Sequence, residues 1–184
     1  MARENIAKYI ILGLLSIQPL SGYGIKKWVE ASISNFWSIS YGQIYPTLRK
    51  IEGEDLAVKR EFKPDKGPRR NQYTITEKGR QEFIRWLQKD EAGEYEILLK
   101  IFFGSRLSPD ENIEKIRRFR ERRVQDTERL EKTLEDLLKN LDKSEDNLYF
   151  LLITSFGIKS YESQIQWSDE ALKLLKDKKK ELKG

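Results

Sequence analysis

Apolar residues recur at helical spacing through the first 50 positions of the chain. In residues 5–15 they fall at positions 6, 9, 10, 13 and 14, which is the spacing of one helix face. After a break at residues 18–22, Ser21 is a plausible N-cap for a second helix, and Ser40 caps a third after a loop at residues 34–38. The inner faces carry Ile25, Trp28 and Val29 in the second helix and Ile44, Leu48 and Ile51 in the third. The pattern therefore predicts three consecutive helices.

A proline inside the third helical pattern leaves open where that helix begins. The ring of Pro46 would crowd the carbonyl of Gly42, and its nitrogen has no hydrogen to donate. Two interpretations are compatible with this: Gly42 relieves the crowding, or the regular helix begins later.

The pattern then changes to short β-prone runs at residues 56–58 and 73–75. Between them lies a turn rich in Gly, Pro and cations at residues 63–70, which predicts a β-hairpin. Thr76, with Gly79 behind it, opens a fourth helix with an apolar stripe at Phe83, Ile84 and Leu87. The predicted order is three helices, a strand, a turn, a strand and a helix, which is the order of a winged helix-turn-helix domain.

The second half of the chain predicts long helices. An apolar run at residues 94–103 and a turn at 104–107 precede Ser108 and Pro109, a strong helix start, and that helix runs to about Leu141. A second long pattern begins near Ser144. Two such helices cannot cover their apolar stripes on each other alone, so we expect a homodimer. The expected fold is mainly α with a small β-hairpin, in two domains: a winged-helix domain at 1–90 and a helical dimerisation domain at 91–184.

Composition narrows the functional classes. The chain has no Cys and no His, which removes the thiol nucleophile, the usual general base and most transition-metal ligands. The segment 22–24 is not a phosphate loop, because no Gly-Lys-Ser/Thr follows it. There is no apolar run of about 18 residues and no signal-type leader. We therefore expect a cytoplasmic protein with no catalytic residues, cofactor, metal or membrane partner.

Positive charge is concentrated in the first half of the chain. Residues 1–90 hold 16 Lys or Arg and 10 Asp or Glu, whereas residues 91–184 hold 19 and 20. The window 59–70 alone holds six cations and two anions. A charge run is often only a solvated face, but cations at a Gly/Pro hairpin tip favour nucleic-acid binding.

Two sequence motifs, taken together with the spacing between them, resemble those of the PadR family of transcriptional regulators. They are Ser-Tyr-Gly-Gln-Ile-Tyr-Pro-Thr-Leu at residues 40–48 and Arg-Asn-Gln-Tyr-Thr-Ile-Thr-Glu-Lys-Gly at residues 70–79, preceded by matching segments at 11–15 and 21–25. The resemblance covers roughly residues 6–90. It implies a homodimer that binds double-stranded DNA, with the third helix in the major groove and the hairpin on the minor groove or backbone. One departure is Asp55, which stands where the family usually has glycine; Asp tolerates a left-handed backbone, so we expect the turn to survive.

The matched helix and the cationic hairpin tip supply the candidate DNA contacts. Those on the third helix are Ser40, Tyr41, Gln43, Thr47 and Lys50, and those on the hairpin are Lys66, Arg69 and Arg70. Gln43 is chemically able to recognise adenine. Ser40 is equally usable as an N-cap, and Tyr45 is a packed aromatic more often than a DNA ligand. Lys26, Lys27 and Arg49 are further candidates for backbone contacts, although solvated helix faces have the same pattern.

The resemblance also implies a small hydrophobic or aromatic effector. The aromatic residues that could line its pocket are Phe102, Phe103, Phe156 and Trp167, each of which is also a candidate for plain core packing. We expect a sequence-specific regulator, and a repressor in particular. A non-specific architectural DNA-binding protein or a helical adaptor is the alternative, and competition with random DNA distinguishes them.

Overall fold

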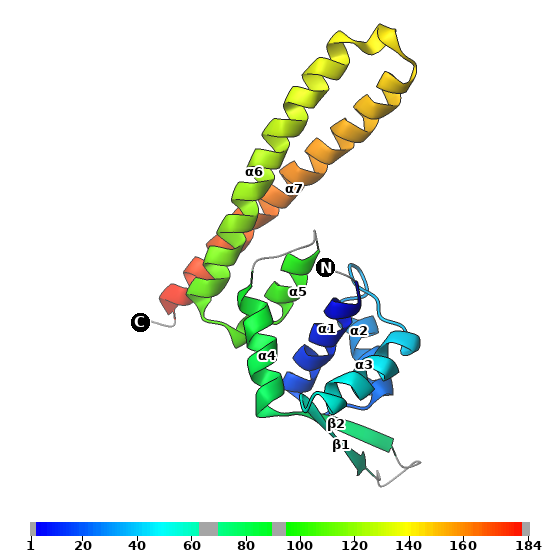
Figure 1. The fold of residues 1–184 in the computed structure, drawn as a ribbon. Coiled ribbons are helices and arrows are strands. Elements are labelled where there is room, and N and C mark those ends of the chain that lie inside the picture. The colour runs from blue at the N-terminus through cyan, green and yellow to red at the C-terminus, as the bar shows by residue number, and fades with distance from the viewer. Residues whose placement is uncertain (1–2, 63–69, 90–94, 182–184) are drawn as a thin grey trace. The chain divides into compact units, whose positions relative to one another are not determined.

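The computed structural model describes residues 3–62, 70–89 and 95–181. They fall into two compact units, Met1–Leu107 and Ser108–Gly184, and each is described here by itself. The first unit contains α1 (Arg3–Ile17), α2 (Gly22–Ser32), α3 (Tyr41–Gly53), β1 (Ala57–Phe62), β2 (Arg70–Ile75), α4 (Glu77–Gln88), α5 (Glu96–Phe102) and η1 (Gly104–Arg106). The second contains α6 (Pro109–Lys139), η2 (Leu141–Lys143) and α7 (Asp146–Glu181). The predicted mainly helical fold with one hairpin is confirmed (Figure 1).

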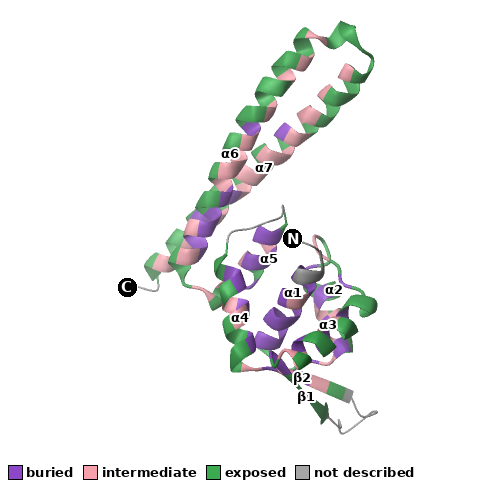
Figure 2. Cartoon of the chain, viewed as in Figure 1, coloured by how far each residue is buried: buried purple, intermediate pink, exposed green. Residues whose placement is uncertain are grey.

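Helix α1 is the centre of the first unit. It packs against α2, α3, α4 and β2, and its residues 9–12 are buried on every side (Figure 2). A helix that is apolar all round needs neighbours on all faces, and the amphipathic helices α2, α3 and α4 supply them. Ile25, Ile44 and Leu87, one from each of these helices, are completely buried in the shared core.

Helix α2 begins beside the hairpin. Ser21 accepts the backbone N–H of Gly24 at 3.1 Å, which confirms it as the N-cap. Just before it, Leu20 pairs with Tyr73 of β2: the N–H of Leu20 donates to Tyr73 O at 3.1 Å, and the N–H of Tyr73 donates to Leu20 O at 2.8 Å. The start of α2 is therefore fixed to the hairpin by the backbone itself.

Helix α3 runs through its proline. It begins at Tyr41 directly after the predicted cap Ser40, and Pro46 lies inside it. Of the two interpretations left by the sequence, a late helix start is therefore wrong. Ile44, Leu48 and Ile51 face the core as predicted.

The exit from α3 depends on a left-handed residue. Asp55 has φ of 57°, and the backbone N–H of Leu56 returns to Ile51 O at 2.8 Å. The turn thus survives with Asp in place of glycine. Leu56 O then accepts the N–H of Thr76, at 3.0 Å, and Thr76 caps α4 by accepting the N–H of Gly79. A Cβ added to Gly79 would collide with Leu56 O, so only glycine fits here.

The hairpin pairs β1 and β2 in antiparallel register. Ala57 lies opposite Ile75 and Lys59 opposite Tyr73, and side chains alternate between the two faces. Ala57, Tyr73 and Ile75 are buried, so the face that they share with Lys59 is turned toward the helices. The predicted hairpin is confirmed and longer than expected, and its turn at residues 63–69 lies outside the described residues.

Helix α5 belongs to the first unit, although the sequence placed a domain change at residue 90. Leu99 and Phe103 join the core of the first unit, and the ring of Phe103 lies against Gly13 of α1. Two residues of the predicted apolar run, Leu99 and Phe103, are therefore part of this core. The two compact units divide between Leu107 and Ser108.

The second unit is a helical hairpin. Helix α6 begins at the predicted cap, where Ser108 and Glu111 form a capping box, and packs along α7. Arg123, which interrupts the apolar seam, lies over the rings of Phe119 and Tyr161 at 5.4 and 4.6 Å from their centroids. Among the described helices, none is long and apolar enough to cross a membrane.

Apolar side chains are exposed toward the end of the second unit where α6 passes into α7. The large hydrophobic residues exposed there are Leu138, Leu141, Leu148, Tyr149, Phe150, Leu152, Ile153 and Phe156. Buried residues lie instead toward the opposite end, at Ile113, Ile116, Phe119 and Leu172 (Figure 2). Within one chain, this helical hairpin does not cover its own apolar surface.

Candidate nucleic-acid interface

The outer face of α3 carries most of the predicted contacts. Ser40, Tyr41, Gln43 and Lys50 are exposed, and Thr47 is half-buried. None of them belongs to the core, which takes the opposite face of the helix. Gln43, Thr47 and Lys50 follow one another at spacings of four and three and so lie along one side of α3, whereas Tyr41 lies on the other side, next to Tyr45.

Two tyrosines widen this surface toward α2. Tyr41 and Tyr45 are 43% and 44% exposed, and their rings stack with centroids 6.1 Å apart. The ring of Tyr45 also lies against Gly22, where an added Cβ would come within 2.7 Å of it. Tyr45 is thus packed on one side and open on the other, so it is not a core aromatic.

Gln43 has a structural task in α3. Its Oε1 accepts the backbone N–H of Ser40 at 3.0 Å and the hydroxyl of Ser40 at 3.3 Å. The amide oxygen is therefore occupied in the free protein, whereas the amide nitrogen is left as a donor. Recognition of adenine uses the oxygen as well, so it would require Gln43 to exchange its cap bond for a base.

The cations of the hairpin are only partly described. Lys66 and Arg69 lie outside the described residues, and Arg70 lies in β2 with a side chain that is not described. The strands add Lys59 and Arg60, which are exposed and form no ion pair within the described residues. Of the further candidates Lys26, Lys27 and Arg49, Lys26 pairs with Glu30 at 3.0 Å and is therefore less available for a contact with DNA.

Comparison with known proteins identifies relatives of this chain. The profile described as "Transcriptional regulator PadR-like family" matches residues 11–85, and one described as "Virulence activator alpha C-term" matches residues 95–176. The chain belongs to the PadR-like family of transcriptional regulators. It is 28% identical to the negative transcriptional regulator PadR of Bacillus subtilis, over 93% of this chain and 98% of that protein.

Solved structures include that relative in two complexes. The crystal structure of B. subtilis PadR with operator DNA is 27% identical, with 92% of this chain and 99% of that chain covered and a TM-score of 0.45. The one with p-coumaric acid is also 27% identical, with 96% and 98% covered and a TM-score of 0.42.

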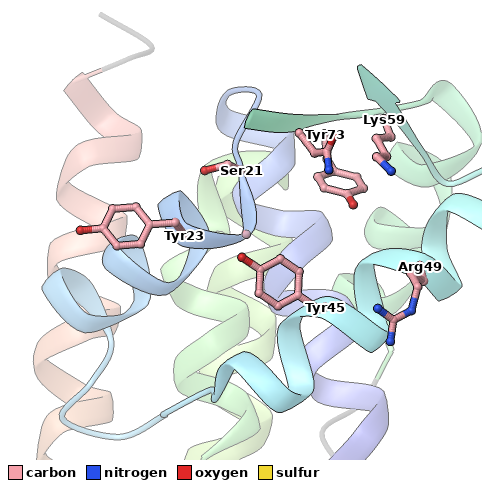
Figure 3. Close-up of a pocket in the computed structure, with 8 residues that line it drawn as sticks. Ser21, Tyr23, Tyr45, Arg49, Lys59 and Tyr73 are labelled. Atoms are coloured by element: carbon pink, nitrogen blue, oxygen red, sulfur yellow. The ribbon is translucent and has the colours of Figure 1, made fainter. Parts of the chain in front are cut away.

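A pocket of about 470 Å³ opens beside α3 in this PadR-like protein (Figure 3). It is lined by Ser21, Gly22, Tyr23, Tyr45, Arg49, Lys59, Asn71 and Tyr73. Sequence analysis proposed only Arg49 among them as a DNA contact. It missed Lys59 and Tyr73 because their approach to α2 depends on the pairing of Leu20 with β2, which joins segments about 50 residues apart.

The four aromatic residues proposed for an effector are not brought together within either unit of this PadR-like chain. Phe103 is 2% exposed and packs edge-to-face on Phe83, so in the first unit it is core, beside the more exposed Phe102. In the second unit, Phe156 is 73% exposed, and Trp167 packs edge-to-face on Phe119. Phe156 and Trp167 are 11 residues apart on α7, or about 16 Å along a helix axis.

The described residues contain no group of three or more Asp or Glu placed to hold a metal ion.

Proposed function

We propose that this protein is a sequence-specific DNA-binding transcriptional regulator that acts as a homodimer. The observation that carries the proposal is the exposed surface of α3, with Gln43 and Lys50 on one side and Tyr41 on the other, next to a hairpin whose Lys59 and Arg60 form no ion pair within the described residues. An α-helix fits the major groove, and a neighbouring basic hairpin reaches the backbone or minor groove. Ser40 and Thr47 complete the helix surface, and Lys66, Arg69 and Arg70 supply the hairpin charge.

Repression is the direction of regulation that we infer. The relative in B. subtilis is named a negative transcriptional regulator, and it aligns with nearly the whole of both chains. That protein has been crystallised with operator DNA and with p-coumaric acid. We therefore expect an operator in double-stranded DNA, and release from it by a small aromatic or hydrophobic molecule.

We assign DNA binding to the first unit and dimerisation to the second. The exposed apolar side chains of residues 138–156 need a partner surface, and a second copy of the chain offers the same residues. Two copies hold two α3 helices at a set distance, which suits a palindromic site. An enzymatic role is not part of the proposal, since the chain contains no His and no Cys and its family regulates transcription. Its place of action is the cytoplasm, with the DNA.

Selection of bound sequences from a random duplex pool tests this function. We expect enrichment of one motif with two-fold symmetry and half-sites about one helical turn apart or a multiple of it. A pool that stays random after selection, with binding that disappears against excess competitor DNA, would instead favour the architectural alternative. No binding to DNA at any salt concentration would favour the adaptor.

A further inference from the structure

The pocket beside α3 receives the hydroxyl of a tyrosine whose ring is buried. Tyr73 is 5% exposed, and its hydroxyl forms no hydrogen bond within the described part of the chain. Figure 3 shows the ring pointing from β2 into the space between Tyr45 and Arg49. Burial and the negative charge of Glu52 raise the pKa of Tyr73, so the hydroxyl keeps its proton at neutral pH. It is a donor that faces the pocket.

Two cations face the same space. Arg49 comes from α3 and Lys59 from β1, and neither forms an ion pair within the described residues. Lys59 lies directly opposite Tyr73 in the hairpin, so the ammonium group and the hydroxyl are on the same face of the sheet. The pocket thus combines two positive charges with a neutral donor, and this is the chemistry of an oxyanion site.

The beginning of α2 adds backbone donors. Ser21 satisfies the N–H of Gly24, whereas the N–H groups of Gly22 and Tyr23 have no acceptor within the helix. The positive end of the helix dipole lies at the same place. The missing side chain of Gly22 lets Tyr45 approach, so a second tyrosine hydroxyl, that of Tyr45, lies beside these donors.

The three walls of the pocket are held in place before any ligand arrives. The two backbone hydrogen bonds between Leu20 and Tyr73, at 3.1 and 2.8 Å, fix β2 to the start of α2. Gln72 also donates to Pro19 O at 3.3 Å. Donors that are already in place cost little ordering entropy when an anion binds.

We propose that this pocket binds one phosphate of the DNA backbone, held jointly by the start of α2, by Arg49 of α3 and by Lys59 and Tyr73 of the hairpin. The inference rests on the proposed function, because it assumes that α3 docks on DNA. Two of the walls, α3 and the hairpin, are the elements that a winged helix presents to the duplex, and the pocket opens to solvent. A phosphate in this place fixes how deep α3 enters the groove, so Tyr73 is a positioning residue for base recognition by its neighbours.

The test compares Tyr73→Phe with Tyr9→Phe. Both remove one hydroxyl from a buried ring of the first unit, but Tyr9 lies outside the pocket and donates to Glu82. We expect Tyr73→Phe to bind DNA about 10-fold more weakly or worse, as removal of a hydrogen bond to a charged group requires. The loss should be the same on operator and on random duplex, since a phosphate carries no sequence. Tyr9→Phe should retain wild-type affinity once circular dichroism confirms its fold.

Two further measurements identify the ligand as a phosphate. Arg49→Gln should lower the slope of log K against log salt by about 0.9, whereas Tyr73→Phe, which removes no charge, should leave the slope unchanged. In a second measurement, the phosphates of the duplex are replaced one at a time by a neutral methylphosphonate. Binding of wild type should weaken when one particular phosphate per half-site is replaced. Replacement of that phosphate should weaken binding of Tyr73→Phe less.

Outcomes that overturn the inference are distinct from those that overturn the function. Wild-type affinity of both Tyr73→Phe and Arg49→Gln on a selected operator would remove the pocket from DNA binding while leaving the regulator intact. Stabilisation of the protein by inorganic phosphate without any effect of these variants on DNA would make the pocket a site for a free anion, against the proposal. If selection yields no motif but Tyr73→Phe still weakens binding to random duplex, the phosphate site stands and the sequence-specific function fails.

Discussion

The amide oxygen of Gln43 accepts the backbone N–H of Ser40 at 3.0 Å, so the side chain best suited to recognise adenine also caps its own helix. A base contact and a helix cap compete for the same oxygen. The free energy of the cap, about 1 kcal/mol, is therefore part of the cost of any bidentate contact with adenine.

Replacing Gln43 by Glu separates these two tasks. Glutamate keeps the capping oxygen, so the free energy of unfolding should stay within about 0.5 kcal/mol of wild type. It loses the amide donor and adds a negative charge near phosphates, so DNA affinity should fall at least 10-fold. Gln43→Ala should lose about 1 kcal/mol of stability as well. Urea denaturation and fluorescence anisotropy measure the two effects; equal affinity of Gln43→Glu and wild type would show that Gln43 only caps.

Glycine is required in the first turn of α4 and dispensable at the end of α3. Gly79→Ala pushes a methyl group into the carbonyl oxygen of Leu56, a backbone atom that cannot rotate away, and should cost about 3 kcal/mol. Gly53→Ala is the matched control, because nothing lies within 4 Å of the added Cβ. It should be neutral or stabilise α3 by up to about 1 kcal/mol. Thermal unfolding of both variants checks the difference, and similar melting temperatures would contradict it.

The hairpin cations should appear in the salt dependence of binding. Replacing Lys66, Arg69 and Arg70 together by Ala should reduce the slope of log K against log salt by about 0.9 for each residue that contacts a phosphate. Lys132→Ala, an exposed cation of α6, is the control and should leave the slope unchanged. An undiminished slope in the triple variant would remove the hairpin tip from the interface.

Local signals in the sequence predicted the element starts well. Ser21, Thr76 and Ser108 act as caps in the structure, because capping depends on residues within one helical turn. The left-handed turn at Asp55 was also predictable, since only a few residue types tolerate that backbone.

Long-range packing was less accessible from the sequence. The place of α5 in the first core depends on Phe103 meeting Gly13, a contact across 90 positions. The phosphate pocket depends likewise on the Leu20–Tyr73 pairing. Pro46 was ambiguous because a missing hydrogen bond can be tolerated when the rest of the helix is held by Ile44, Leu48 and Ile51.

A network of α1, α3 and α4 should make the first unit sensitive to acid. Lys8 pairs with Glu82 at 3.5 Å and with Glu54 at 3.0 Å, and the Tyr9 hydroxyl donates to Glu82 at 3.1 Å. Burial alone would raise the pKa of Glu82, but the charge of Lys8 and these hydrogen bonds outweigh it and lower the pKa. A lowered pKa stabilises the fold above the unfolded pKa of about 4.5, and this stabilisation is lost as the pH falls through the folded value.

The variant Glu82→Gln tests whether the stabilisation by Glu82 is lost as the pH falls. It should be less stable than wild type at pH 7, and the difference should shrink as the pH falls below about 4.5. At the alkaline end, burial and Glu82 raise the pKa of Tyr9 to about 12, so wild type should lose stability between pH 10 and 12. Tyr9→Phe should lose less over that interval. Urea denaturation across pH measures both effects, and a constant difference between Glu82→Gln and wild type would contradict the assignment.

The exposed apolar side chains of the second unit predict the oligomeric state. Ile153 and Phe156 are 72% and 73% exposed on α7, and lysine at both positions should make a dimer interface there unfavourable. Light scattering should shift from twice 21.8 kDa to 21.8 kDa, and operator affinity should fall steeply because the two half-site contacts are no longer linked. Glu162→Lys, a charge change at an exposed position of the same helix, should remain dimeric. Binding to an isolated half-site should be nearly unchanged in the double variant, since the first unit carries α3 and the hairpin.

A double variant that stays dimeric would place the interface elsewhere on the chain, whereas a monomer with full operator affinity would separate dimerisation from recognition.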